Sequence, residues 1–264
     1  MREIPTVIEM DRLLSERAKN SHYSLSREWL HGFVEAEGSF IGREGQSPFF
    51  EITQHASDCF LMLAIKRFIG GGRVDLKRRR DGRLLSVYTL AGKRSLVEKL
   101  LPLWQNSYAS PKVLKSFQPW LGVHFPQEKI VTNGTQISGN WLAGFTDGDG
   151  SFHTVFRRQK DYRIGFQFQA VFDLAQKYDP LFADCTRKNV LLSSLKDQWF
   201  SDYSPIRRIE PSSKLRFALH QEIPHARRGD TIQRSSSQKG VDHLRLARAT
   251  YLDEKVIPLF ETYK

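Results

Sequence analysis

The stretch WLHGFVEAEGSF at residues 29–40 returns as WLAGFTDGDGSF at residues 141–152, 112 positions further along the chain. Seven of the twelve positions are identical, and Glu35 and Glu37 of the first copy are matched by Asp147 and Asp149 in the second. A repeat of this length, with acids exchanged only for acids, predicts a chain built from two similar halves.

Weaker sequence similarity between the two halves continues after each motif. FEITQ at residues 50–54 matches FDLAQ at 172–176, and LPLW at 101–104 matches IPLF at 257–260. The offset has by then grown to 156, so the second half carries about 44 extra residues, and the Arg-, Ser- and Gln-rich residues 223–240 are interpreted as one insertion.

These matches predict four segments: an N-terminal extension (1–25), a first half (26–125), a polar linker containing Asn-Gly (126–137) and a second half (138–264). The first half continues well past Trp104, whereas the sequence stops four residues after Phe260. We therefore expect the second half either to lack the corresponding last helix or to be trimmed.

Each motif has the signals of a short helix. Ser26 and Ser138 stand where a side chain caps the first turn, and Gly38 and Gly150 stand where glycine ends a helix. Small residues recur four apart, as Gly32 with Ala36 and Gly144 with Gly148. Because a glycine inside a helix costs about 1 kcal/mol, we expect a close contact between two helices through this face.

After each motif the apolar period changes from 3.6 to 2, which predicts half-buried antiparallel strands. Strands are expected over residues 152–157 and 166–175, and around 50–53 and 87–90, with helices over 61–69 and 95–103. The predicted fold class is α+β, with two α-β-β-α-β-β-α halves that each leave one sheet face for a ligand.

The charge, the apolar runs and the cysteine count of the sequence limit the classes of function that it can have. The 264 residues hold 40 Lys and Arg against 29 Asp and Glu, a net charge of +11 that both halves share and that favours a polyanionic partner. No apolar run approaches the ~20 residues of a membrane span. Two cysteines support neither a disulfide framework nor a zinc site, so we expect a reducing compartment. Phosphate-loop and nucleophile-elbow motifs are absent from the sequence.

The doubled motif, LHGFVEAEG at residues 30–38 and LAGFTDGDG at 142–150, resembles the LAGLIDADG homing endonucleases in their single-chain form with two motifs. His31 departs from the alanine usual in the family. The resemblance implies two pseudo-symmetric halves whose antiparallel sheets form a saddle, with the motif helices packed at the interface. It also implies an intron-encoded, monomeric, site-specific endonuclease that hydrolyses both strands of duplex DNA across the minor groove, leaving short 3′ overhangs. Such a protein would act in a chloroplast, a mitochondrion or a microbial cytoplasm.

The motif chemistry fits a metal-dependent nuclease. Two paired helices would bring Glu37 and Asp149 together at C-terminal ends, where helix dipoles add negative charge. Mg²⁺ relieves this repulsion, and the carbonyls of Ala36 and Gly148 could join its shell. By resemblance, two or three divalent ions bind there, and Glu35 and Asp147 brace the helices instead.

Three further catalytic residues come from the resemblance. It places Gln54 and Gln176 near the attacking water and gives Lys112 the role of stabilising phosphoryl charge. No counterpart of Lys112 can be assigned in the second half.

DNA contacts are predicted from strand parity, because long polar side chains on a sheet face can read base edges in the major groove. The predicted readers are Arg43, Glu51, Arg157, Gln167, Gln169 and Asp173. A basic run before an Asp-Gly turn is expected to contact mostly phosphates; it consists of Lys77, Arg78, Arg79 and Arg80.

Two other functions remain open on the same fold. One is an RNA maturase that assists splicing of a group I intron, with intron RNA as its partner. The other is a sequence-specific DNA-binding protein that does not cleave. Retention of both motif acids favours the endonuclease over either.

Overall fold

The structure is a computed structural model, and it describes residues 25–106, 111–131, 137–158, 160, 164–177, 190–202, 232–234, 241–247 and 251–262. The chain divides into two compact units: residues 1–149 with 260–264, and residues 150–259. Nearly all of the predicted N-terminal extension lies outside the described residues, as do residues 132–136 of the predicted linker.

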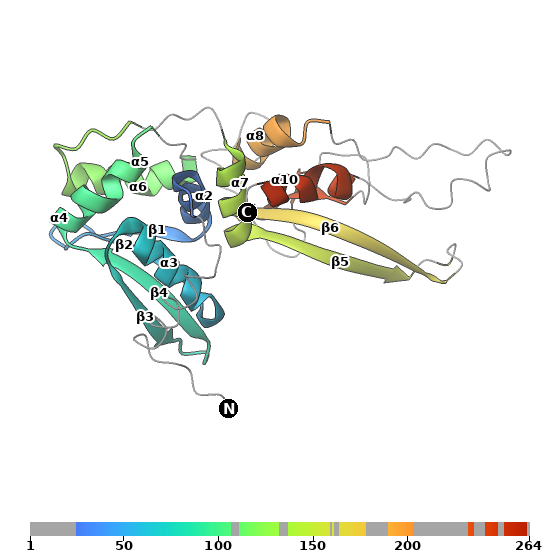
Figure 1. The fold of residues 1–264 in the computed structure, drawn as a ribbon, viewed down its shortest axis with the longest axis horizontal. Coiled ribbons are helices and arrows are strands. Elements are labelled where there is room, and N and C mark those ends of the chain that lie inside the picture. Colours follow the sequence, from blue (N-terminus) through green and yellow to red (C-terminus); the bar gives the residue numbers. More distant parts are fainter. Residues whose placement is uncertain are drawn as a thin grey trace. The chain divides into compact units, whose positions relative to one another are not determined.

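The first unit contains a four-stranded antiparallel sheet in the order β1-β2-β4-β3, with helices packed on one face (Figure 1). Its elements are α2 (Arg27–Glu37), β1 (Gly38–Ile41), β2 (Phe49–His55), α3 (Cys59–Ile69), β3 (Arg73–Arg78), β4 (Leu84–Ala91), α4 (Lys93–Ser95), a π-helical turn η2 (Leu96–Leu100), α5 (Leu101–Trp104), α6 (Pro111–His124) and α7 (Gly139–Asp149). The unit therefore includes the helix of the second motif. The assignment of residues 138–264 to one half stays a prediction.

The second unit has the same plan, with strand order β5-β6-β8-β7. Its elements are β5 (Gly150–Arg158), β6 (Phe166–Lys177), α8 (Val190–Trp199), β7 (Ile232–Arg234), β8 (Val241–Leu246), a π-helical turn η4 (Leu252–Val256) and α10 (Ile257–Thr262), which continues into the first unit. Counted from α2 and from α7, both halves read α-β-β-α-β-β-α, which confirms the predicted fold class. Residues 223–240 are not simply an inserted loop, because β7 lies within them and pairs with β8.

The strand register confirms the sequence match after each motif. Phe40 of β1 lies opposite Phe50 of β2, and Phe152 of β5 lies opposite Phe172 of β6. The ring centroids are 5.3 Å apart in the first pair and 4.8 Å in the second. The two sheets therefore start from the same aromatic pair, immediately after a motif helix.

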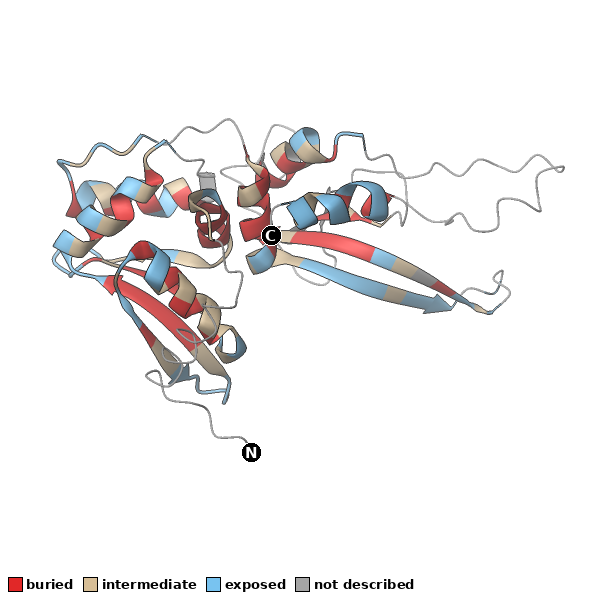
Figure 2. Cartoon of the chain, viewed as in Figure 1, coloured by how far each residue is buried: buried red, intermediate tan, exposed pale blue. Residues whose placement is uncertain are grey.

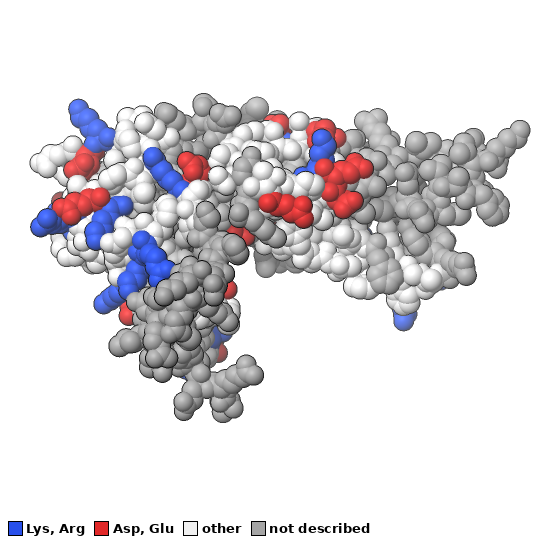
Figure 3. All heavy atoms as spheres, viewed as in Figure 1, with Lys and Arg blue, Asp and Glu red and all other residues white. Residues whose placement is uncertain are grey.

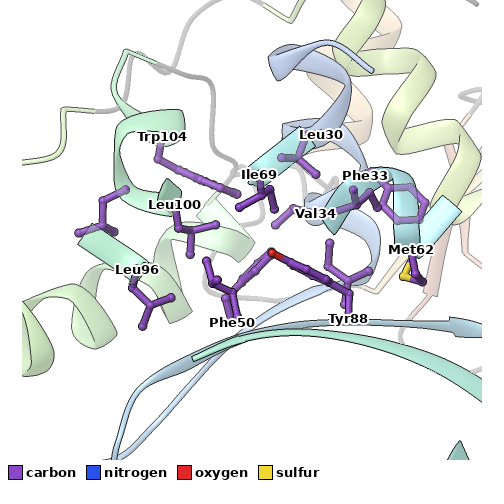
Figure 4. Packing of buried hydrophobic residues seen from close by; sticks show 14 of the residues in the cluster. Leu30, Phe33, Val34, Phe50, Met62, Ile69, Tyr88, Leu96, Leu100 and Trp104 are labelled. Carbon is purple, nitrogen blue, oxygen red and sulfur yellow. The ribbon is translucent and has the colours of Figure 1, made fainter. Parts of the chain in front are cut away.

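Side chains of α2 anchor that helix on the first sheet. Leu30, Phe33 and Val34 point toward Phe50 and Tyr88, and all five side chains are almost completely buried (Figure 4). Burying one such side chain contributes roughly 1.5–3 kcal/mol, so this contact fixes the position of α2 on the sheet.

Proline explains the π-helical turns. In both units the turn ends one residue before an α-helix whose second residue is proline, Pro102 after η2 and Pro258 after η4. Proline donates no N–H and its ring clashes with the carbonyl four residues earlier, which favours a wider turn at that point. The shared irregularity supports the match between LPLW and IPLF.

Candidate functional site

Both motif helices begin as predicted. The Ser26 hydroxyl accepts a hydrogen bond from the Trp29 backbone N–H at 3.0 Å, and the Ser138 hydroxyl accepts one from the Trp141 backbone N–H at 3.1 Å. Each serine satisfies a donor that the helix itself leaves unpaired. The same cap therefore sets the start of α2 and of α7.

The helices α2 and α7 lie side by side and touch through their glycines (Figure 1). A Cβ atom built on Gly32 would lie 1.9 Å from the carbonyl oxygen of Trp141, and one built on Gly144 would lie 1.9 Å from that of Trp29. This reciprocal contact leaves room for hydrogen only. The predicted packing through small residues is confirmed, and both helices are largely buried (Figure 2).

Asp147 braces the pair, as predicted. Its carboxylate accepts a hydrogen bond from the indole N–H of Trp29 at 2.8 Å, joining the two helices across 118 residues of sequence. Glu35, the matching acid of α2, is 2% exposed and so is directed into the protein, whereas Asp147 is exposed.

The two motif acids end their helices where α2 and α7 meet. A Cβ atom on Gly148 would lie 2.3 Å from the Ala36 Cβ and 3.2 Å from the Cγ of Glu37, so the Glu37 side chain reaches the last turn of α7. Asp149 is the next residue, and both acids are half-buried. Each adds negative charge at a helix C-terminus, an arrangement that attracts cations.

Gly38 is required after α2 because there is no room for a side chain, and not because the backbone adopts a conformation that only glycine allows. Its φ of −83° and ψ of 150° are extended values that any residue adopts. A Cβ atom there would lie 2.4 Å from Cγ1 of Val34. The glycine therefore lets the chain turn from α2 directly into β1 beside the acid.

The donor set at the helix ends consists of oxygen ligands, which hard divalent cations such as Mg²⁺ take. Among the described residues no three His, Cys, Asp or Glu side chains come together as a ligand cluster. Mg²⁺ usually binds through one or two carboxylates and completes its shell with water and substrate phosphate. Two half-buried carboxylates, with helix-end carbonyls such as those of Ala36 and Gly148, fit this mode of metal binding.

The other predicted catalytic residues lie on three elements. Gln54 is half-buried near the end of β2, and Gln176 is 4% exposed at the matching place in β6 of the second unit. Both share strand parity with the core residues of their strands, so they face the helix-covered side. Lys112 lies in the first turn of α6, and its side chain is outside the described part.

Two ion pairs of the described residues lie on the open face of the first sheet, and one of them joins Arg73 and Asp75 of β3 at 3.1 Å. Glu51 of β2 lies 3.9 Å from the ammonium of Lys77 on β3, and it also accepts a 3.4 Å hydrogen bond from Thr53. Arg43 is exposed in the loop between β1 and β2.

The basic run was expected on one hairpin loop, but this is wrong, because the run begins on the last two residues of β3 and continues into the turn. Lys77 and Arg78 are the last residues of β3 and point to opposite faces, whereas Arg79 and Arg80 are exposed in the turn. Only part of the run can therefore act as a common phosphate contact.

In the second sheet, the prediction that Gln167 and Asp173 are exposed is wrong. Each is 6% exposed, and the Asp173 carboxylate accepts a 2.7 Å hydrogen bond from Arg245 directly across on β8. Alternation within β6 could not predict the contact of Asp173, since its partner is 72 residues away in the sequence. Gln169 is half-buried and donates to the Ala247 carbonyl at 3.4 Å, and Arg157 is exposed.

His31, the departure from the motif, fills the space between α2 and α5. It is 5% exposed and its ring centroid lies 4.9 Å from that of Trp104. Burial, with a smaller contribution from the Arg27 charge, lowers the pKa of His31 to about 4. The imidazole is therefore neutral at physiological pH and has a structural place away from the helix contact.

Basic and acidic side chains are interspersed on the face of the first unit seen in Figure 3. The excess positive charge of the chain is therefore not gathered into one patch on that face. None of the helices in the described ranges is both long and apolar enough to cross a membrane.

Two capped helices in backbone contact, each leading into an antiparallel sheet and each ending in an acid, define a two-motif α+β protein of the LAGLIDADG type. The family model described as LAGLIDADG endonuclease matches residues 30–124 and 142–200. The chain belongs to this family.

Relatives agree with this assignment. A probable intron-encoded endonuclease 4 of Neurospora crassa is 31% identical over 131 residues, which are 47% of this chain and 23% of that protein. The chain thus spans about a quarter of the length of that curated relative.

Solved structures share the fold. The meganuclease I-SmaMI bound to uncleavable DNA has a TM-score of 0.62 at 21% identity, over 91% of this chain and 83% of that one. The meganuclease I-CpaMI bound to uncleaved DNA has a TM-score of 0.56 at 16% identity, over 91% and 86%.

Proposed function

We propose that this chain is an intron-encoded homing endonuclease that hydrolyses both strands of a specific duplex DNA with divalent metal. The reciprocal contact of Gly32 and Gly144 with the backbone of the opposite helix carries the proposal. It draws together two helices that each end in an acid, in a chain that belongs to an endonuclease family.

Glu37 and Asp149 would hold Mg²⁺, with the carbonyls of Ala36 and Gly148 as further ligands. When bound, two or three such ions supply an activated water and stabilise the leaving oxygen of the phosphodiester. Gln54 and Gln176 would orient the water by hydrogen bonds, and the Lys112 ammonium would offset charge on the phosphoryl group. A structure of I-SmaMI with uncleaved DNA and calcium ions supports the choice of a divalent ion.

Duplex DNA would be read by the sheet faces that the helices leave open. Glu51 and Arg157 lie on these faces, and Arg43 lies in a loop beside one, whereas Gln167, Gln169 and Asp173 are less exposed. Arg79 and Arg80, exposed in the turn after β3, would contact phosphates. We propose that one chain, with its halves at 26–125 and 138–264, acts as a monomer on an asymmetric target. Its proposed place of action is an organelle or a microbial cytoplasm.

Cleavage of the exon junction that the intron interrupts tests the proposal. The full chain is incubated with duplex DNA spanning that junction, in Mg²⁺ or in EDTA, beside the Glu37→Gln variant. We expect a double-strand break in Mg²⁺ only, and unimpaired binding without cleavage by Glu37→Gln.

Two results would reject it. Tight binding of the intron RNA with no cutting of the junction in Mg²⁺ or Mn²⁺ would favour a maturase. Selective binding of the duplex without cutting would favour a DNA-binding protein.

A further inference from the structure

Equivalent positions of the two sheets carry an acid paired with a base. Glu51 and Asp173 occupy the same place in FEITQ and FDLAQ, one residue after the matched Phe50 and Phe172. Glu51 pairs with Lys77 at 3.9 Å, and Asp173 pairs with Arg245 at 2.7 Å. The basic partners come from different strands, so they are not a product of the repeat.

Both pairs lie on the open face of their sheet. The residues on either side of each acid are core residues: Phe50 and Ile52 in β2, Phe172 and Leu174 in β6, all 0% exposed. Because neighbouring side chains of a strand alternate between faces, the acids point away from the helices. Leu244 and Leu246, both 0% exposed, place Arg245 on the same open face by the same argument.

In each pair the base is more accessible than the acid. The side chains of Asp173 and Arg245 are 8% and 38% exposed, and those of Glu51 and Lys77 are 26% and 52% exposed. A buried carboxylate has to be paired, so Asp173 holds the guanidinium in place. The Arg245 Nε is buried, so the donors that Arg245 can offer to a ligand are those N–H groups of its partly exposed guanidinium that do not contact Asp173.

We infer that Arg245 and Lys77 each determine base specificity at one position of their half-site, with Asp173 and Glu51 as positioning residues. Guanine is the base with two major-groove acceptors, O6 and N7, which an arginine fork or a lysine ammonium matches. The inference rests on the proposed function, because it requires duplex DNA against the open faces.

The two half-sites are read with unequal stringency on this account. Arg245 is planar and tied at 2.7 Å, whereas Lys77 is a flexible point charge held at 3.9 Å. The guanine preference is therefore stronger in the half-site that the second unit reads. Exposed arginines at hairpin turns, such as Arg79, lack such a tie and contact phosphates without sequence preference.

Selection from a randomised duplex DNA library tests the inference. The full chain and its variants Arg245→Ala, Arg245→Lys, Asp173→Asn and Lys77→Ala are taken through rounds of binding, and the bound duplexes are sequenced. Arg158→Ala is the matched control, since Arg158 is an exposed arginine whose strand parity places it on the opposite face of the second sheet. Melting temperatures identify any variant that has lost its fold.

We expect Arg245→Ala to lose the preference for guanine at one position by about 5- to 100-fold and to keep it elsewhere. Arg245→Lys, which keeps the charge and the fold, weakens the same preference while overall affinity is retained. Asp173→Asn weakens it too, and Lys77→Ala acts at one position of the other half-site. Arg158→Ala leaves all preferences unchanged.

A uniform loss of affinity in Arg245→Ala, with all base preferences retained, would overturn the inference and make Arg245 a phosphate contact. Unchanged selection by both Arg245 variants would overturn it as well, leaving a structural ion pair. A wild-type chain that selects no sequence from the library would instead reject the proposed function.

Discussion

The contact between the motif helices makes the replacement of Gly144 by alanine a sharp test. The added methyl carbon would lie 1.9 Å from the Trp29 carbonyl oxygen, 2.8 Å from its carbon and 3.0 Å from the Phe33 nitrogen. All three atoms belong to the backbone of α2, so no flexible side chain can give way. The helices would have to separate by at least about 1.1 Å to bring the first contact to 3.0 Å.

Two opposing effects set the size of the change. Overpacking a close-packed site costs typically about 1–3 kcal/mol, and rigid backbone on the facing side puts Gly144→Ala at the upper end. Alanine recovers about 1 kcal/mol through its better helix propensity. The net expectation is a loss of about 2 kcal/mol, which for a chain of this size lowers Tm by roughly 4–8 °C.

Thermal unfolding followed by circular dichroism measures this shift. Gly122→Ala in α6 is the matched control, because a Cβ atom there meets nothing within 4 Å and the variant should be stabilised by about 1 kcal/mol. Gly32→Ala should behave like Gly144→Ala, and Gly144→Leu should cost more. A Gly144→Ala protein as stable as Gly122→Ala would refute the backbone contact.

Three further outcomes are expected. In the unfolded state His31 binds a proton below about pH 6.5, whereas in the folded protein it stays neutral down to about pH 4, so the free energy of unfolding decreases as the pH falls from 6.5 to 4. Urea titrations at pH 7 and pH 4.5 should show that the wild type loses about 2 kcal/mol more than His31→Ala. Trp29→Phe removes the donor to the exposed Asp147 and should cost about 1 kcal/mol in the same titrations, and an unchanged midpoint would argue against the brace. Replacing Arg79 and Arg80 with glutamine should weaken binding to all duplexes alike and reduce the slope of log K against log salt by about 2, whereas a change at single base pairs would make them readers.

Local signals predicted the framework of this protein because they depend on nearby residues. The serine caps, the ends of the motif helices and the strands after them follow from spacing within about ten residues, and the structure has all of them. The glycine contact was also predictable, since Gly32 and Gly144 are costly in a helix unless another backbone approaches them.

Features that join distant segments were beyond such signals. Gln167 and Asp173 were predicted to be exposed from alternation in β6, but both are buried, and Asp173 lies directly across from Arg245 of β8. Arg245 was overlooked for the same reason, although its place between two apolar leucines in VDHLRL was a usable signal. Alternation tells which way a side chain points, whereas the neighbouring strand decides whether water reaches it.

A crystal structure of the chain with its target duplex and Mn²⁺, located by anomalous scattering, measures the central claim most directly. We expect manganese bound to carboxylate oxygens of both Glu37 and Asp149, where α2 and α7 end. Manganese bound elsewhere, or carboxylates of residues 37 and 149 turned away from each other and from the DNA, would contradict it.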